Sequence, residues 1–81
     1  MSLEALRQLL ASVNSRIADA RAHCALAKSL LEESRRAIVE PQGKAEPWLP
    51  THLVHALEQI DNQTGRLAGV SELLNRYQAR L

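Results

Sequence analysis

The residues that could bind a transition metal or act as a nucleophile are few: three histidines and one cysteine in 81 residues. His52 and His55 are three apart, which places both on one face of a helix at a spacing that a metal could bridge. His23 and Cys24 lie far from them in sequence and, in a chain folded back on itself, about 20 Å away. We therefore predict no metal and no cofactor, and expect Cys24 to be a small buried apolar residue.

The sequence has no pattern typical of catalysis and only a weak one for nucleic-acid binding. The serines have no paired base and no oxyanion-hole motif, so we predict that the chain is not an enzyme and has no catalytic residues. A stripe of basic residues could follow a phosphate backbone: Arg7, Arg21, Lys28 and Arg35. It gives the alternative function, a small regulator that contacts nucleic acid. Asp61 can reach Lys28 across a hairpin, and the net charge is only +1, so nucleic acid is the less favoured partner.

A heptad pattern predicts the element that holds most of these residues. Steps of three and four alternate without a break through Leu3, Leu6, Leu10, Val13, Ile17, Ala20, Cys24, Ala27, Leu31, Ser34 and Ile38. With Leu3 at position a, this is the a/d seam of a long amphipathic helix. We predict a helix over residues 2–39, with Ser2 as its N-cap and Pro41 ending it.

A second helix follows a single break. All three prolines and one glycine fall within residues 40–50, which predicts a loop. A second seam runs through Leu53, Leu57, Ile60, Thr64, Leu67, Ser71, Leu74, Gln78 and Leu81, predicting a helix over 51–81. Two long helices joined by a short loop lie antiparallel, so residues 1–81 form one all-α helical hairpin that resembles a coiled coil. Glu32–Arg36 and Glu72–Arg76 have the spacing of helical ion pairs.

The two flanks of this hairpin differ in polarity. The e positions are mostly polar or basic, whereas several g positions are apolar, and g faces g in an antiparallel pair. An apolar flank on one side needs a cover, and a second hairpin would supply it in a four-helix bundle. We predict a dimer, with itself or with another protein, whose interface residues are Leu9, Leu30, Leu49, Val70, Tyr77, Gly65, Gly69 and Trp48.

Trp48 and two glycines have more than one interpretation. Trp48 either closes the end of the core with Val39 and Leu49, which we favour, or is an exposed anchor for a partner. Gly65 and Gly69 each disfavour a helix by about 0.8–1 kcal/mol relative to alanine. They fall at positions b and f, turned away from the seam. Our hypothesis is that they form a second contact surface for a partner helix.

Composition limits the remaining possibilities. With no Phe, one Trp and one Tyr, the apolar residues suit helix packing better than sheets. One cysteine cannot form an intrachain disulfide, which favours a reducing compartment. The first residues do not resemble a secretory signal peptide, and no apolar run approaches the ~20 residues of a membrane-spanning helix. We expect a soluble, cytoplasmic protein with no membrane partner, and signal-peptide-independent export is compatible with this.

Two long helices with Trp48 in the turn resemble the Trp-x-Gly helical-hairpin proteins of type VII secretion. Tyr77 lies about where the tail tyrosine of that family falls. The turn here reads Trp48-Leu49-Pro50, without the family's glycine, and Leu81 stands where its export signal has an acidic residue. The resemblance implies a homodimeric or heterodimeric four-helix bundle. We therefore expect a non-enzymatic protein-interaction module, such as a secretion-type partner, a small chaperone or an anti-activator.

Overall fold

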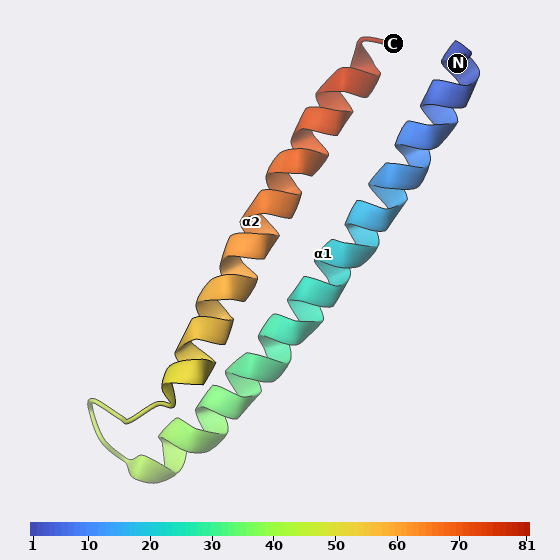
Figure 1. Cartoon of the computed structure of the whole chain (residues 1–81). Coiled ribbons are helices and arrows are strands. Elements are labelled where there is room, and N and C mark those ends of the chain that lie inside the picture. Colours follow the sequence, from blue (N-terminus) through green and yellow to red (C-terminus); the bar gives the residue numbers. More distant parts are fainter.

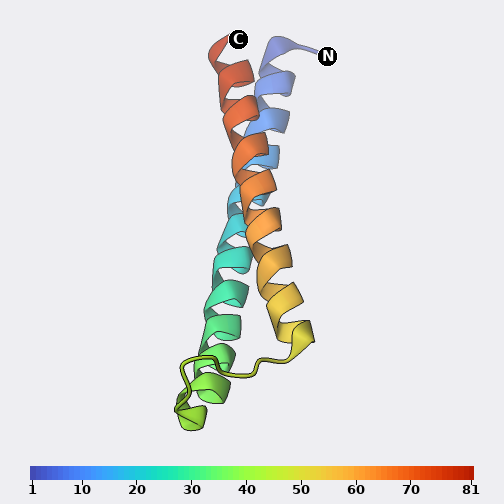
Figure 2. The ribbon, with the colours of Figure 1, turned by 90° about the vertical axis from the view of Figure 1, so that its left-hand side faces the viewer.

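The computed structural model describes all 81 residues as two long antiparallel helices joined by one loop (Figure 1). Helix α1 spans Leu3–Val39 and helix α2 spans Thr51–Ala79. The rod measures 61 × 16 × 15 Å. In Figure 2, turned by 90°, α2 passes in front of α1 and the two helices cross, with both termini at one end and the loop at the other. There is no strand, and the predicted all-α hairpin is confirmed.

The helix ends follow the local sequence. Ser2 lies just outside α1, and its hydroxyl accepts a 3.0 Å hydrogen bond from the Ala5 amide, as expected of an N-cap. The helix therefore begins at residue 3, one residue later than predicted. It ends at Val39, and a 3₁₀ turn that contains Pro41 follows over Glu40–Gln42. Helix α2 ends at residue 79, two residues earlier than predicted, with Arg80 as its C-cap.

The heptad seams face each other as the spacing predicts. Every residue of the second seam, from Leu53 to Leu81, is partly buried, and the seam residues of α1 are partly or fully buried apart from Leu3 and Ser34. Yet only two residues in the chain are buried, Leu10 and Cys24, each 8% exposed. Two helices shield only the strip where they meet, so the hairpin has a seam but no enclosed core.

Polar side chains at the e positions of α1 form contacts with α2 and with the C-terminal residue. Lys28 Nζ lies 2.8 Å from an Asp61 carboxylate oxygen, which confirms that ion pair. A hydrogen bond to Asp61, and then its charge, raise the pKa of Lys28, with a smaller effect from Glu32. Near the termini, the Arg7 guanidinium donates to the Leu81 carbonyl at 2.9 Å. The Lys28–Asp61 contact joins two e positions and so confirms that e faces e across the hairpin.

Of the two ion pairs predicted within the helices, one is present and one is absent. Arg76 and Glu72 form the predicted pair, with a nitrogen–oxygen distance of 2.6 Å. The Glu32–Arg36 prediction was wrong, because the structure contains no such ion pair. Glu32 lies one turn after Lys28 and its charge acts on that lysine instead.

A side-chain amide holds the loop together. Gln42 Nε2 donates to the carbonyls of Ile38 (2.9 Å) and Trp48 (2.8 Å), while Gln42 Oε1 accepts from the Trp48 amide at 2.8 Å. Gly43 adopts the left-handed conformation, φ 59°, that ends the 3₁₀ turn. Because Gln42 bonds the backbone of Trp48, the indole is not needed to close the hairpin.

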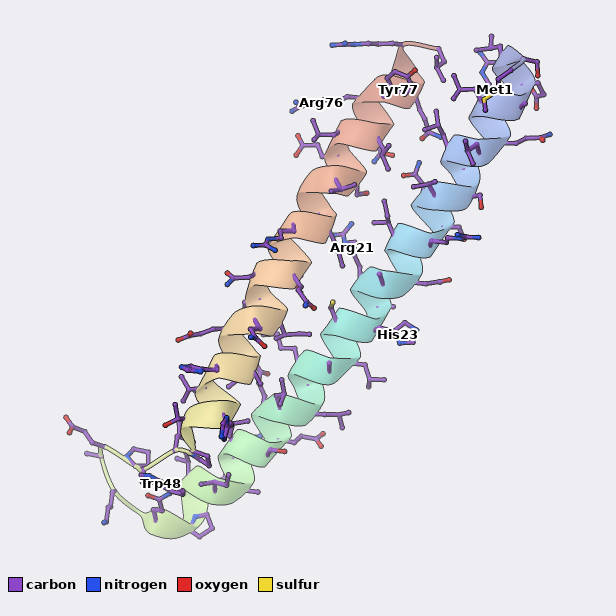
Figure 3. All side chains as sticks on the ribbon, viewed as in Figure 1. Met1, Arg21, His23, Trp48, Arg76 and Tyr77 are labelled. Carbon is purple, nitrogen blue, oxygen red and sulfur yellow. The ribbon has the colours of Figure 1, made fainter.

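The prediction that Trp48 closes the end of the core was wrong. Its side chain is 69% exposed, so it does not close the end of the core. Figure 3 shows it in the loop, at the opposite end of the rod from Met1 and Tyr77. Leu49 and Pro50 are partly buried and pack at this end in its place.

Candidate protein-interaction face

Exposed apolar side chains gather along one side of the hairpin. Nine large apolar residues are at least 45% exposed, and six of them lie at heptad positions g and c. We call these six the apolar face: Leu9, Leu26, Leu30, Val70, Leu73 and Tyr77. Three come from α1 and three from α2, so the face runs across both helices. Isolated exposed leucines are ordinary, but a row of them shared by two helices is a candidate interaction surface.

Heptad geometry explains why c belongs with g. Around a helix these positions are neighbours, and together they form a second seam beside a/d, again with steps of three and four. In a four-helix bundle each helix uses one seam for its hairpin partner and the other for a second neighbour. A comparison of the e and g positions leaves out Leu26 and Leu73, which lie at c and are 61% and 63% exposed.

The predicted interface residues divide into three groups. Leu9, Leu30, Val70 and Tyr77 belong to the exposed apolar face. Leu49 lies partly buried in the loop, and Trp48 is exposed there, away from the face. The two helical glycines are exposed at b and f, outside the g and c positions that form the face. The structure thus gathers four of the eight residues on one surface.

The opposite flank carries the basic stripe. Lys28 is paired with Asp61, and Arg7 donates to the carbonyl of Leu81. Arg21 and Arg35 are exposed. In Figure 3, Arg21 projects over the gap between the helices and His23 projects from the other side of α1, as expected for e and g positions. Two of the four basic side chains are thus engaged within the hairpin.

The rest of the surface has no metal cluster, no apolar pocket and no membrane-spanning helix. No three His, Cys, Asp or Glu residues come together in a way that could hold a metal ion. His52 and His55 are both exposed. The two surface hollows have no apolar lining: one lies between Glu32 and Arg36, the other between Gln59 and Arg66. Neither helix contains a stretch long and apolar enough to cross a bilayer.

The chain was then compared with known proteins. Family models, curated proteins and solved structures gave no match. The resemblance to the type VII secretion hairpins therefore stays a prediction.

Cys24 offers a direct probe of the seam. Its thiol is free and its residue is 8% exposed, so we expect slow reaction with a thiol reagent in the native state and fast reaction in denaturant. Cys24→Ala should unfold at nearly the same denaturant concentration, because Ala20 and Ala27 already occupy the neighbouring layers. Fast native labelling would contradict the burial of this position.

One polar contact sits where the seam meets the e flank. Asn14 Nδ2 donates to Gln78 Oε1 at 2.7 Å, whereas Asn14 Oδ1 is buried without a donor. Gln78→Ala should lower the free energy of unfolding by about 1–3 kcal/mol, because both polar atoms of Asn14 then lack partners. Replacing Asn14 and Gln78 together by leucine should be neutral or stabilising. Denaturant titrations measure both, and a double variant less stable than Gln78→Ala would show that the pair itself stabilises the hairpin.

The hairpin does not require the glycines of α2. A Cβ atom at Gly65 or Gly69 would meet nothing within 4 Å. Each alanine variant should therefore raise the free energy of unfolding by up to about 1 kcal/mol, seen as a higher melting temperature. The second-contact hypothesis adds that Gly69→Leu weakens assembly on that side. If Gly69→Leu assembles normally and also melts higher, the glycines are a tolerated defect.

Proposed function

We propose that this chain is a non-enzymatic protein-interaction module that covers its apolar face with another pair of helices, completing a four-helix bundle. One observation carries the proposal: six of the nine exposed large apolar side chains share one seam across both helices. Burying that seam removes apolar area from water, the main favourable term in protein association.

The exposed area of the hairpin supports the need for a cover. The chain exposes 6253 Å². A compact monomeric protein of 9.0 kDa would expose about 4,900 Å². The excess, on the order of 1,400 Å², is larger than the ~800 Å² that one partner contributes to an interface of standard size. A 9.0 kDa chain with two buried residues gains much of its stability from such a partner.

The protein-binding function fits the charges better than the nucleic-acid alternative. On the basic flank the charge of Lys28 is paired with that of Asp61, and the net charge of the whole chain is only +1, so the hairpin has no strongly basic surface to follow a phosphate backbone. Phosphate contacts make affinity fall steeply with salt, whereas burial of an apolar face does not. Assembly that persists from low to high salt is therefore the expected behaviour.

Association of the purified chain tests the proposal. Sedimentation equilibrium over micromolar to near-millimolar concentrations should give a mass above 9.0 kDa. If the partner is a different protein, the chain should capture it in fixed stoichiometry. Leu73→Lys should abolish either outcome, whereas Asn62→Lys, exposed at position f of the same helix, should leave it unchanged. A folded monomer that captures nothing would contradict the proposal.

A further inference from the structure

Trp48 is the largest apolar side chain that the hairpin leaves in solvent, and it lies outside the apolar face. It is 69% exposed and belongs to the loop, at the far end of the rod from Tyr77 (Figure 3). A large aromatic ring gains free energy by packing onto any apolar surface within reach, because much apolar area then leaves the water. Val39 and Leu49 flank the loop and are only partly buried. Some contact therefore keeps the indole away from them.

The side-chain amide of Gln42 makes that contact. Its Oε1 accepts a hydrogen bond from the Trp48 amide at 2.8 Å, and its Nε2 donates to the Trp48 carbonyl at 2.8 Å. Nε2 also donates to the Ile38 carbonyl at 2.9 Å, which anchors the same amide to the end of α1. We call these three hydrogen bonds the Gln42 clamp. The clamp holds both backbone polar groups of Trp48 and so fixes the direction of its Cα–Cβ bond.

No other polar contact holds this part of the loop. Residues 44–49 form no backbone–backbone hydrogen bond. Their side chains form no hydrogen bond and no ion pair either, so the two bonds between Gln42 and the Trp48 backbone are their only polar attachment. The exposed position of the indole thus depends on one side chain.

We propose that Trp48 is a two-position lid at the loop end of the hairpin. With the Gln42 clamp formed, the indole stands in solvent, where it is available to another molecule. With the clamp broken, it folds onto Val39 and Leu49 and covers the end of the seam. Three hydrogen bonds between neutral groups contribute only modestly, because water replaces them when they break. The two positions therefore differ little in free energy, and a small change of contacts shifts the population between them.

The fluorescence of Trp48 tests this inference, because it is the only tryptophan in the chain. Gln42→Ala removes the clamp and leaves the ring unaltered. The emission should move to shorter wavelength, and acrylamide should quench it roughly half as efficiently, since part of the ring then lies against the hairpin. Gln42→Glu keeps an acceptor but has no donor when ionised, so it should shift the emission in the same direction.

The measurements use a Leu73→Lys background at low micromolar concentration, so that they report on a single hairpin. Gln8→Ala is the matched control, because Gln8 is an exposed glutamine near the opposite end of the rod. It should leave emission and quenching as in the parent. Val39→Ser, added to Gln42→Ala, should reduce the shift, because the folded indole then loses an apolar neighbour. Far-ultraviolet circular dichroism checks that the variants compared have the same helix content.

The outcomes separate the lid from a loop that only loosens. A shift to shorter wavelength with weaker quenching, reduced by Val39→Ser, supports the inference. Unchanged emission, or stronger quenching than in the parent, overturns it, because the indole then stays in solvent without the clamp. A shift that Val39→Ser leaves intact overturns it as well, since the ring packs elsewhere. Parent emission typical of a buried indole would also overturn it.

These results are independent of the proposed function. Trp48 lies outside the apolar face, and the fluorescence is measured on single hairpins. The mass of the assembled chain tests the apolar face, whereas the emission of Trp48 tests the lid. Failure of the lid therefore leaves the protein-interaction function standing, and a chain that never assembles leaves the lid standing.

Discussion

Leu30→Glu is expected to abolish assembly. Leu30 is 55% exposed in the hairpin and occupies a g position on the apolar face, so a partner would bury it. An unpaired carboxylate there is unfavourable by roughly 3–5 kcal/mol. Since about 1.4 kcal/mol corresponds to a tenfold change in an equilibrium constant, the dissociation constant should rise by roughly two to three and a half orders of magnitude. Sedimentation equilibrium measures this as a return to a mass of 9.0 kDa.

Ser29→Glu is the matched control for this variant. Residue 29 is next in sequence, exposed, and at position f on the outer side of the same helix. The two variants have the same charge and a nearly identical position along the rod, so they differ mainly in the face they alter. Ser29→Glu should assemble like the parent. If both variants assemble normally, the interface lies elsewhere on the hairpin.

The architecture was predictable because heptad spacing is a strong and redundant signal. Many seam residues agree on one register, and an error of one position would have turned them all to solvent. Pro41 marked the end of the first helix for a purely local reason, since the residue before a proline avoids the helical conformation. The Lys28–Asp61 pair followed from the register alone and is present at 2.8 Å.

The position of the Trp48 side chain could not be predicted from the sequence, because it depends on which side chain of the loop forms hydrogen bonds with the loop backbone. Trp48 was expected to close the core, but Gln42 bonds the loop backbone and leaves the indole exposed. No residue-type preference identifies a glutamine in that role. Leu26 and Leu73 are a different case, because the sequence alone shows that they lie at c positions, three or four residues from the apolar g positions. They were missed because the flanks were compared through e and g only.

Leu10→Ala is expected to have the largest effect on the hairpin itself. Leu10 is the only large apolar residue that the two helices bury, at 8% exposure. Truncating a buried leucine lowers the free energy of unfolding by about 2–5 kcal/mol, since it loses apolar burial and leaves a cavity. The neighbouring layers hold Leu6 and Val13, which are only partly buried and can relax toward the space. We therefore expect about 2–3 kcal/mol, a large share of the stability of so small a domain.

Leu3→Ala is the control for Leu10→Ala. The two residues occupy the same heptad position one repeat apart, so the chemistry, helix and direction of the change are identical. They differ in burial, because Leu3 is 50% exposed at the first residue of α1. Because the stabilisation from a leucine depends on how much of it is buried, Leu3→Ala should lower the free energy of unfolding by less than half as much as Leu10→Ala. Denaturant titrations of both variants at one protein concentration measure this. Equal losses would mean that another chain buries Leu3 in the assembled state.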